Sequence, residues 1–229
     1  AAAPQAVLMD VVREPQLGSI DRLLWRRAQT APQLCVGASS VAQALIDHWG
    51  LPRRRHDGRV APARGPLLVL AGSLSPLTAR QVAAARSYLH VPLDAHRLAR
   101  GDAAHIRQTI DDLVRALQAG RHVLAHTTPL DAPGGVAHGD LAAQCGRLLR
   151  SVLMEAPVSR LGVAGGDTSS HALQALAPTS LEWLGRPAPG VALCRAHAEA
   201  PWLDGTEVML KGGQMGDDNL FETLVTGSR

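Results

Sequence analysis

The chain of 229 residues is 46% hydrophobic and 19% charged, with a net charge of +3 at pH 7, which is ordinary for a water-soluble globular protein with a sizeable core. No apolar run approaches the roughly 20 residues of a membrane-spanning helix, and the aromatic residues, 3% of the chain, are too scattered to form a stacking platform for single-stranded nucleic acid. We therefore expect neither a membrane nor a nucleic-acid partner.

The cysteines Cys35, Cys145 and Cys194 form no C-x-x-C pair. The sequence thus indicates neither a disulfide framework nor a cysteine zinc site, and we expect a cytoplasmic protein. The cluster Arg53-Arg54-Arg55 lacks an accompanying recognition helix, which favours a solvated linker over a DNA contact. The chain begins without methionine and without the basic region of a signal peptide, so we expect residue 1 to be an internal position of a longer protein.

The first fifty residues predict two strand–helix pairs, that is, a partial βαβα unit. The predicted elements are a strand at 6–12, a helix at 19–28, a strand at 33–36 and a helix at 41–49. Residues 51–65 are rich in proline, glycine and arginine and have no apolar period, which is typical of a linker between domains. We expect residues 1–50 to be part of one domain and residues 66–229 to form another.

Residues 66–229 predict alternating strands and helices. The strands are expected at 67–71, 121–125, 158–164, 190–194 and 207–210, and the helices at 76–88, 103–119, 140–154, from 167–170 to 176, and at 217–225. Ser75 is expected to cap the first of these helices, with Pro76 at its first position. This alternation predicts an α/β three-layer sandwich with a mostly parallel or mixed central sheet, whose ligands bind beyond the carboxyl ends of the strands.

Three loops, each following a predicted strand, carry residues that suit phosphate binding. They are Gly72-Ser73-Leu74-Ser75, Gly165-Gly166-Asp167-Thr168 and Lys211-Gly212-Gly213. Hydroxyl and backbone N–H groups bind phosphate oxygens, and the lysine adds a charge that its glycine-rich flanks are expected to leave exposed. Gly165 and Gly166 lack a Cβ, so an anion can approach the positive end of the following helix, which Asp167, Thr168, Ser169 and Ser170 are expected to cap.

These loops also have structural explanations that involve no ligand. The glycine pair can serve a tight connection that needs glycine for its geometry and serine or threonine for its cap, and Lys211, the only lysine of the chain, can be a solvated residue at a strand end. Neither a Walker A motif nor G-x-G-x-x-G occurs, so neither a P-loop NTPase nor a Rossmann oxidoreductase is supported. His122 and His126 are four residues apart, but further metal ligands are not evident, which favours structural histidines.

In order and spelling, these loops resemble those of the four-carbon acid sugar kinases, a family long catalogued as a domain of unknown function, with some members labelled Hrp-dependent type III effector. The matching stretches are Leu70-Ala71-Gly72-Ser73-Leu74-Ser75-Pro76-Leu77-Thr78-Ala79-Arg80-Gln81, Ala164-Gly165-Gly166-Asp167-Thr168-Ser169, Pro189-Gly190-Val191 and Leu210-Lys211-Gly212-Gly213-Gln214-Met215-Gly216. The resemblance covers residues 66–229 as the family's C-terminal nucleotide-binding domain. Residues 1–50 resemble the end of its acid-sugar-binding domain, with Gly37-Ala38-Ser39-Ser40 where the family usually has Gly-Ser-x-Gly.

The resemblance implies an ATP site. Its expected residues are Ser73, Ser75, Gly165, Gly166, Asp167, Thr168, Lys211, Gly212 and Gly213. The family transfers the γ-phosphoryl group of ATP to a hydroxyl of a four-carbon sugar acid such as threonate, erythronate or an oxo-tetronate. Its members commonly form homodimers, so the resemblance also implies a homodimer. Gly212 stands where the family commonly has serine, and Met215 where phenylalanine is common, so local contacts are expected to differ.

Catalysis needs more than these loops supply. Asp167 is a candidate for holding Mg²⁺ because of its place in the glycine loop, whereas the catalytic base is expected from the part of the acid-sugar-binding domain that this sequence lacks. We therefore expect the chain to bind nucleotide and to turn over poorly. The alternative is a non-catalytic nucleotide-sensing or partner-binding module, resembling a type III effector. No G-x-S-x-G motif supports a serine hydrolase.

Overall fold

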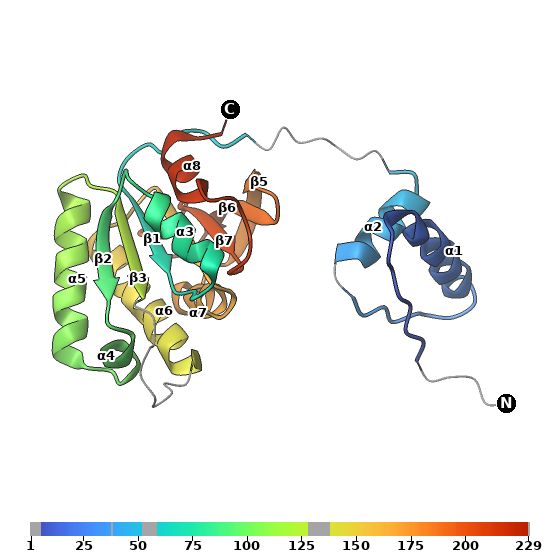
Figure 1. Ribbon diagram of the computed structural model, residues 1–229, viewed down its shortest axis with the longest axis horizontal. Coiled ribbons are helices and arrows are strands. Elements are labelled where there is room, and N and C mark those ends of the chain that lie inside the picture. Colours follow the sequence, from blue (N-terminus) through green and yellow to red (C-terminus); the bar gives the residue numbers. More distant parts are fainter. Residues whose placement is uncertain (1–5, 38, 52–58, 128–137, 229) are drawn as a thin grey trace. The chain divides into compact units, whose positions relative to one another are not determined.

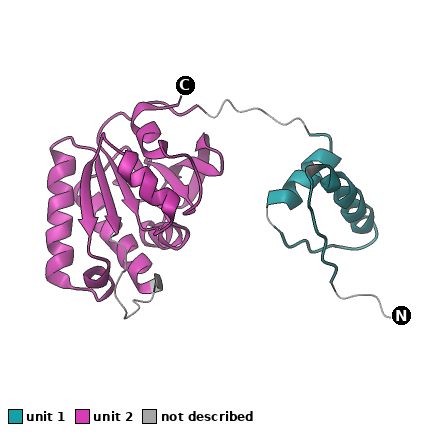
Figure 2. Ribbon diagram, viewed as in Figure 1, with its two compact units in different colours: residues 1–55 teal, residues 56–229 magenta. Residues whose placement is uncertain are grey.

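The computed structural model describes residues 6–37, 39–51, 59–127 and 138–228. The chain divides into two compact units, residues 1–55 and residues 56–229 (Figure 2). Each unit has its own set of packed elements.

The first unit is a pair of helices. A 3₁₀ turn at Glu14–Gln16 leads into α1, Leu17–Ala28, and α2 follows at Ser39–His48. Trp25 on α1 packs edge-on against Trp49, with ring centroids 5.3 Å apart, an arrangement that aromatic pairs prefer. Both helices of the sequence prediction are confirmed, each within about two residues.

The two strands predicted in this unit, at 6–12 and 33–36, are wrong. In the described residues of the first unit these segments belong to no strand, and several of their apolar side chains are exposed: Leu8, Val12, Leu34 and Val36. A strand is stabilised by hydrogen bonds to a neighbouring strand and by burial of one face. The apolar pattern suited a strand, but the described part of this unit supplies no pairing partner.

The second unit contains a seven-stranded sheet in the order β2-β3-β1-β4-β7-β6-β5 (Figure 1). The strands are β1 Leu67–Ala71, β2 Leu89–Leu93, β3 Val123–Thr127, β4 Arg160–Ala164, β5 Ser180–Ala188, β6 Val191–His197 and β7 Glu207–Lys211. The first five strands in this order are parallel, and β6 and β5 are antiparallel to their neighbours. The predicted mixed sheet is confirmed.

Helices cover both faces of this sheet (Figure 1). They are α3 Pro76–Ala84, α4 Ala95–Ala99, α5 Ala103–Gln118, α6 His138–Glu155, α7 Gly166–Leu176 and α8 Leu220–Thr226. Alternate residues of β1 enter two separate cores: Leu68 and Leu70 join the core that α5 and α6 share, whereas Leu67 and Val69 join the core that contains Phe221 of α8. A central parallel strand buried on both faces requires this continuous apolar run, and the predicted three-layer sandwich is confirmed.

Three elements of the second unit escaped prediction: β2, α4 and β5. The predicted helix 76–88 ends at Ala84, and the chain turns into β2, an edge strand that contains Pro92. Proline is tolerated at a sheet edge because no ladder hydrogen bond is lost there. β5 is the other edge strand, most of its residues are exposed, and its pairing with β6 has register shifts. Edge strands therefore lack the apolar run that identifies central ones.

The second unit also includes chain before residue 66. Val60 is 3% exposed, and Ala63 N–H donates to Val225 O at 2.9 Å. The last part of the segment predicted as a linker thus packs against the end of α8. In the part of the chain that the structure describes, no helix is long and apolar enough to cross a membrane.

Candidate functional site

The three glycine-containing loops leave the sheet side by side. Ala71, Ala164 and Lys211 are register partners across the parallel strands β1, β4 and β7. The ladder continues one step into the loops, because Gly72 N–H donates to Ala164 O and Gly165 N–H donates to Lys211 O, each at 2.9 Å. All three loops therefore begin at one level of the carboxyl edge of the sheet, where open α/β folds bind ligands.

Glycine is required where these loops meet. A Cβ on Gly72 would overlap the Thr168 side chain, and one on Gly213 would lie 2.6 Å from Ser73 Oγ. Gly165 has φ of +125°, a backbone conformation that other residues rarely adopt. The loops after β1, β4 and β7 are thus packed against one another through their glycines, and a side chain at any of these positions would push them apart.

Gly166 differs from these glycines because its surroundings are open. It is the first residue of α7, it is exposed, and apart from its chain neighbours and the nearby backbone of its own helix no described atom lies within 4 Å of the position a Cβ would take. The first backbone hydrogen bond of the helix runs from Ser169 N–H to Gly165 O. The N–H groups of Gly166, Asp167 and Thr168 precede that bond and lie at the positive end of the helix, so this end is suited to an anion.

The predicted capping of α7 is wrong. Gly165 is the N-cap and, in the described structure, makes no side-chain capping bond. Asp167 to Ser170 lie inside the first turns instead, where Ser169 Oγ donates to Val163 O at 3.4 Å and Ser170 Oγ to Gly166 O at 3.1 Å. The helix begins at the second glycine of the pair. The polar residues that follow therefore lie inside the helix, beyond the N-cap position, and cannot cap it.

Lys211 is buried, which corrects the expectation of an exposed charge. The residue is only 2% exposed. Its Nζ donates to Thr78 Oγ1 at 2.9 Å and to Gly213 O at 3.2 Å. Burial disfavours the charged form and lowers the pKa of Lys211 to about 8. The lysine thus lies beneath the loops and binds protein oxygens, and it places a titratable positive charge below the candidate site.

The hydroxyl of Ser75 also makes its hydrogen bonds to other groups of the protein. As predicted, it caps α3, accepting from Thr78 N–H at 3.1 Å, with Pro76 at the first helical position. Its hydroxyl also donates to Gly213 O at 2.5 Å. Both serines are half-buried, but in the described residues the Ser73 hydroxyl acts as an acceptor, from Ser75 N–H at 3.2 Å. Of the two serines, Ser73 is therefore better placed to meet a ligand.

The described side chains do not by themselves form a metal centre. Among the described residues, no group of three or more His, Cys, Asp or Glu side chains could hold a metal ion. Asp167 is exposed in the first turn of α7, where its carboxylate could share a cation with a phosphate-bearing ligand, as Mg²⁺ commonly requires. The residues present thus fit a metal that arrives with its ligand.

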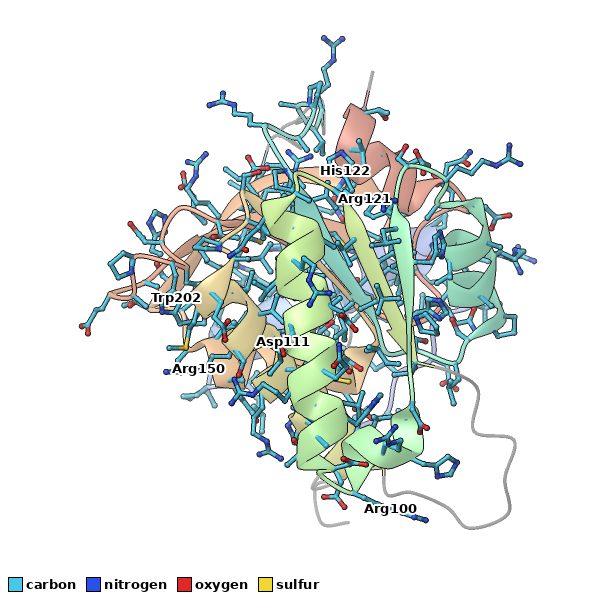
Figure 3. The ribbon with its side chains drawn as sticks, turned by 90° about the vertical axis from the view of Figure 1, so that its left-hand side faces the viewer. Arg100, Asp111, Arg121, His122, Arg150 and Trp202 are labelled. Atoms are coloured by element: carbon cyan, nitrogen blue, oxygen red, sulfur yellow. The ribbon has the colours of Figure 1, made fainter. Side chains whose placement is uncertain are left out.

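His122 directly precedes β3 and His126 lies within it. Leu67 N–H donates to His122 Nδ1 at 3.3 Å, and Figure 3 shows His122 beside Arg121 at the end of α5 opposite to Arg100. His126 lies within β3, and burial together with the nearby His90 lowers its pKa. Four residues of strand span about 13 Å, so these two imidazoles cannot share one ion, and the structural reading is the one that fits.

A cavity of about 390 Å³ lies at the opposite edge of the sheet, where β4 and β7 begin. Its lining includes Arg160, Trp202 and Glu207. Arg160 is 2% exposed, and its guanidinium is already held by Glu207 Oε2 at 2.7 Å and by Ala61 O at 3.0 Å. Because this arginine is engaged by protein and parallel sheets bind ligands at the other edge, the three loops are the better candidate site.

Sequence reasoning missed two residues of the site, Thr78 and Gln81. Both are buried on α3, and both bond to the loop that follows β7: Thr78 Oγ1 donates to Gly213 O at 3.0 Å, and Gln81 Nε2 donates to Met215 O at 3.1 Å. The signal that could have found them is their spacing. With Ser75 they form a polar stripe at every third residue of a helix, a face that would otherwise be apolar.

The model of a protein family described as the nucleotide-binding C-terminal domain matches residues 68–221. The chain belongs to this family. The match runs from the second residue of β1 to the start of α8 and includes all three loops, and it confirms the resemblance that the loops suggested.

Curated relatives point the same way. The chain is 34% identical to a 3-oxo-isoapionate kinase of Paraburkholderia graminis, over 96% of the chain and 52% of the relative. It is 32% identical to a 3-oxo-tetronate kinase of Cupriavidus necator, over 82% of the chain and 45% of the relative. The chain thus spans about half the length of these relatives.

Solved structures share the fold. A protein of Haemophilus influenzae superposes with a TM-score of 0.66 at 24% identity, covering 93% of the chain and 51% of that protein. A domain of unknown function from Bordetella bronchiseptica, described as a domain-swapped dimer with bound citrate, superposes with a TM-score of 0.60 at 21% identity, covering 93% of the chain and 50% of that protein. At these identities the likeness concerns the fold.

Proposed function

We propose that this chain is the ATP-binding portion of a kinase that phosphorylates acid sugars of the tetronate type. The observation that carries the proposal is the meeting of three glycine-containing loops around the open N-terminus of α7. Support comes from relatives named 3-oxo-tetronate and 3-oxo-isoapionate kinases. A kinase site must neutralise phosphate charge and hold the transferred group in line, and this edge of the sheet offers groups for the first task.

The proposed phosphate contacts are mainly backbone groups. The N–H groups of Gly166, Asp167 and Thr168 are proposed to bind phosphate at the start of α7, where the surroundings of Gly166 are open, and the hydroxyl of the half-buried Ser73 adds a donor from the loop after β1. Gly166, whose surroundings are open, leaves room for close approach. Oriented N–H groups bind phosphate without having to reorganise when charge develops.

Side chains beneath the loops set the electrostatics of the proposed site. Lys211 stays buried and contributes its charge from below while holding Gly213 O at 3.2 Å. Ser75 and the glycines Gly212 and Gly213 shape the loop after β7 rather than contributing charge. Asp167 is proposed to hold Mg²⁺ together with the nucleotide phosphates, and the cation would neutralise charge on the transferred phosphoryl group.

The rest of the catalytic machinery is proposed to come from outside this chain. The chain spans about half of its curated relatives. We assign residues 1–50 to the end of an acid-sugar-binding domain, and residues 66–229 to the nucleotide-binding domain, with the base for the acceptor hydroxyl in the remainder of the sugar domain. A cytoplasmic location fits the three free cysteines, and a homodimer is proposed from the family resemblance.

Titration calorimetry tests nucleotide binding, and ³¹P NMR tests phosphoryl transfer. We expect the folded chain to bind Mg·ATP and Mg·ADP, and a complete protein that contains it to transfer phosphate from ATP to an oxo-tetronate. Absence of heat from either nucleotide with folded protein would refute the binding proposal. Nucleotide binding without transfer to any tetronate, in the complete protein, would replace the kinase with the non-catalytic module.

A further inference from the structure

Polar side chains of α3 and of its N-cap residue donate hydrogen bonds to main-chain carbonyl groups of the loop that follows β7. Ser75 Oγ and Thr78 Oγ1 both lie within hydrogen-bond distance of Gly213 O, at 2.5 and 3.0 Å. These donors are separated from Gly213 by more than 130 residues of chain. The contact therefore joins the β1 side of the candidate site to its β7 side.

The same face of α3 continues the contact one turn further. Gln81 is fully buried, and its Nε2 donates to both Met215 O at 3.1 Å and Asp217 O at 2.8 Å. Its Oε1 has no hydrogen-bond partner among the described residues. Burying a side-chain amide costs free energy unless its polar atoms are hydrogen-bonded, and packing alone does not require such a group. We therefore take the two hydrogen bonds to the loop as the reason for its position.

Thr78 also organises the buried lysine. Its hydroxyl accepts from Lys211 Nζ at 2.9 Å and donates to Gly213 O at 3.0 Å. Without this hydroxyl the ammonium would lose one of its two recorded acceptors in a nearly inaccessible place, and a buried charge tolerates that poorly. The lysine and the Gly213 carbonyl would then both have to move.

We propose that Thr78 and Gln81 are positioning residues of the nucleotide site, fixing the main chain of residues 212–217 and the Lys211 ammonium against the loop after β1. The inference rests on the proposed nucleotide site. Gly213 packs directly on Ser73, as the 2.6 Å approach of a Cβ placed there shows. A shift of residues 212–217 would therefore displace residues that line the proposed site. Displacements of about 1 Å are enough to weaken binding by a preorganised site.

The test compares one pair of threonines. Thr109, in α5, is also buried, at 6% exposure against 1% for Thr78, and its hydroxyl donates only within its own helix, to His105 O at 2.8 Å. Mg·ATP affinity and thermal unfolding are measured for the wild type, Thr78→Val, Thr78→Ser and Thr109→Val. We expect Thr78→Val to lower affinity about tenfold, Thr78→Ser to restore it, and Thr109→Val to leave it unchanged.

A second pair tests the other residue. Gln81→Met keeps the side-chain length and removes both donors to the loop, and it is expected to weaken Mg·ATP binding by a similar factor. Arg80→Ala, one residue away, removes an ion pair to Asp218, which follows the positioned segment 212–217. Both side chains of this pair are exposed, and such pairs contribute little, so affinity should be unchanged. This pair decides the matter should Thr78→Val fail to fold.

The outcomes separate the two proposals. No Mg·ATP binding by the wild type would overturn the nucleotide site itself. Wild-type binding together with unchanged affinity in Thr78→Val and Gln81→Met would overturn the positioning role alone. Equal losses of affinity in Thr78→Val and Thr109→Val, each in step with lost stability, would likewise overturn it, because the effect would then be general destabilisation.

Discussion

Substitution of Gly166 by valine separates ligand binding from folding. Gly166 is the first residue of α7, its φ lies outside the left-handed region, and no described atom beyond its chain neighbours and the nearby backbone of its own helix lies within 4 Å of an added Cβ. A Cβ is therefore accommodated in the folded protein, and we expect valine to be tolerated there. It would project into the space in front of the helix N–H groups, where the nucleotide phosphates are proposed to lie.

The expected magnitudes differ between the two properties. Valine is a few tenths of a kcal/mol better than glycine inside a helix, so the free energy of unfolding should change by less than about 0.5 kcal/mol. Blocking phosphate from one or two N–H groups removes hydrogen bonds to a charged group, each contributing about 1.5–3 kcal/mol. A loss of about 2–3 kcal/mol corresponds to a roughly 30- to 160-fold weaker Kd.

Titration calorimetry with Mg·ATP and thermal unfolding provide the assay. Gly65→Val is the matched control, since Gly65 is in the same unit, also has open space around its Cβ position, and precedes β1 at the opposite edge of the sheet. It should bind Mg·ATP as the wild type does. Wild-type affinity in Gly166→Val would refute the placement of phosphate at the start of α7.

Three further predictions follow from the same geometry. Gly72→Ala should lower the free energy of unfolding by about 1–3 kcal/mol in urea titrations, because its Cβ would overlap the buried Thr168 side chain; unchanged stability would contradict the close packing of the loops. Asp167→Asn should leave thermal stability unchanged, since Asp167 is exposed, and should weaken nucleotide binding in Mg²⁺ but not in EDTA; equal affinities in Mg²⁺ would remove it as a metal ligand. Burial lowers the pKa of Lys211 from 10.5 to about 8, so the unfolded chain binds more protons between these values, and stability should rise with pH in that window. Lys211→Met should show a smaller rise in urea titrations at pH 8 and 10, and an identical rise would count against a buried, titrating lysine.

The central part of the fold could be predicted from the sequence because its strands are buried on both faces. Residues 67–71 and 158–164 are short apolar runs that end at glycine, and such runs indicate central parallel strands whatever surrounds them. The level at which the three loops meet also follows, since parallel strands place their carboxyl ends at one edge. The sequence therefore predicts the edge of the sheet at which the candidate site lies.

The direction of individual side chains could not be predicted. Lys211 is buried because β7 delivers it beneath α3, where Thr78 and Gly213 O accept its hydrogen bonds. That contact joins segments 133 residues apart and depends on how the helix packs over the sheet. Local composition, which pointed to an exposed charge among glycines, contains no information about that packing.

The strands predicted at 6–12 and 33–36 failed for a different reason. Their apolar pattern suits a strand, yet Leu8 is 90% exposed and Leu34 is 91% exposed in the first unit. A residue pattern reports which side chains would be buried if a sheet were present. It does not report whether a neighbouring strand exists to receive the backbone hydrogen bonds.

Hydrogen–deuterium exchange with and without Mg·ATP tests most directly whether nucleotide binds at the three loops. We predict that nucleotide slows exchange in residues 72–75, 166–168 and 212–216, and leaves residues 157–160 and 201–207, beside the cavity that includes Arg160 and Trp202, as they are in the free protein. Protection confined to the cavity residues would contradict the account, because it would place the nucleotide at the opposite edge of the sheet.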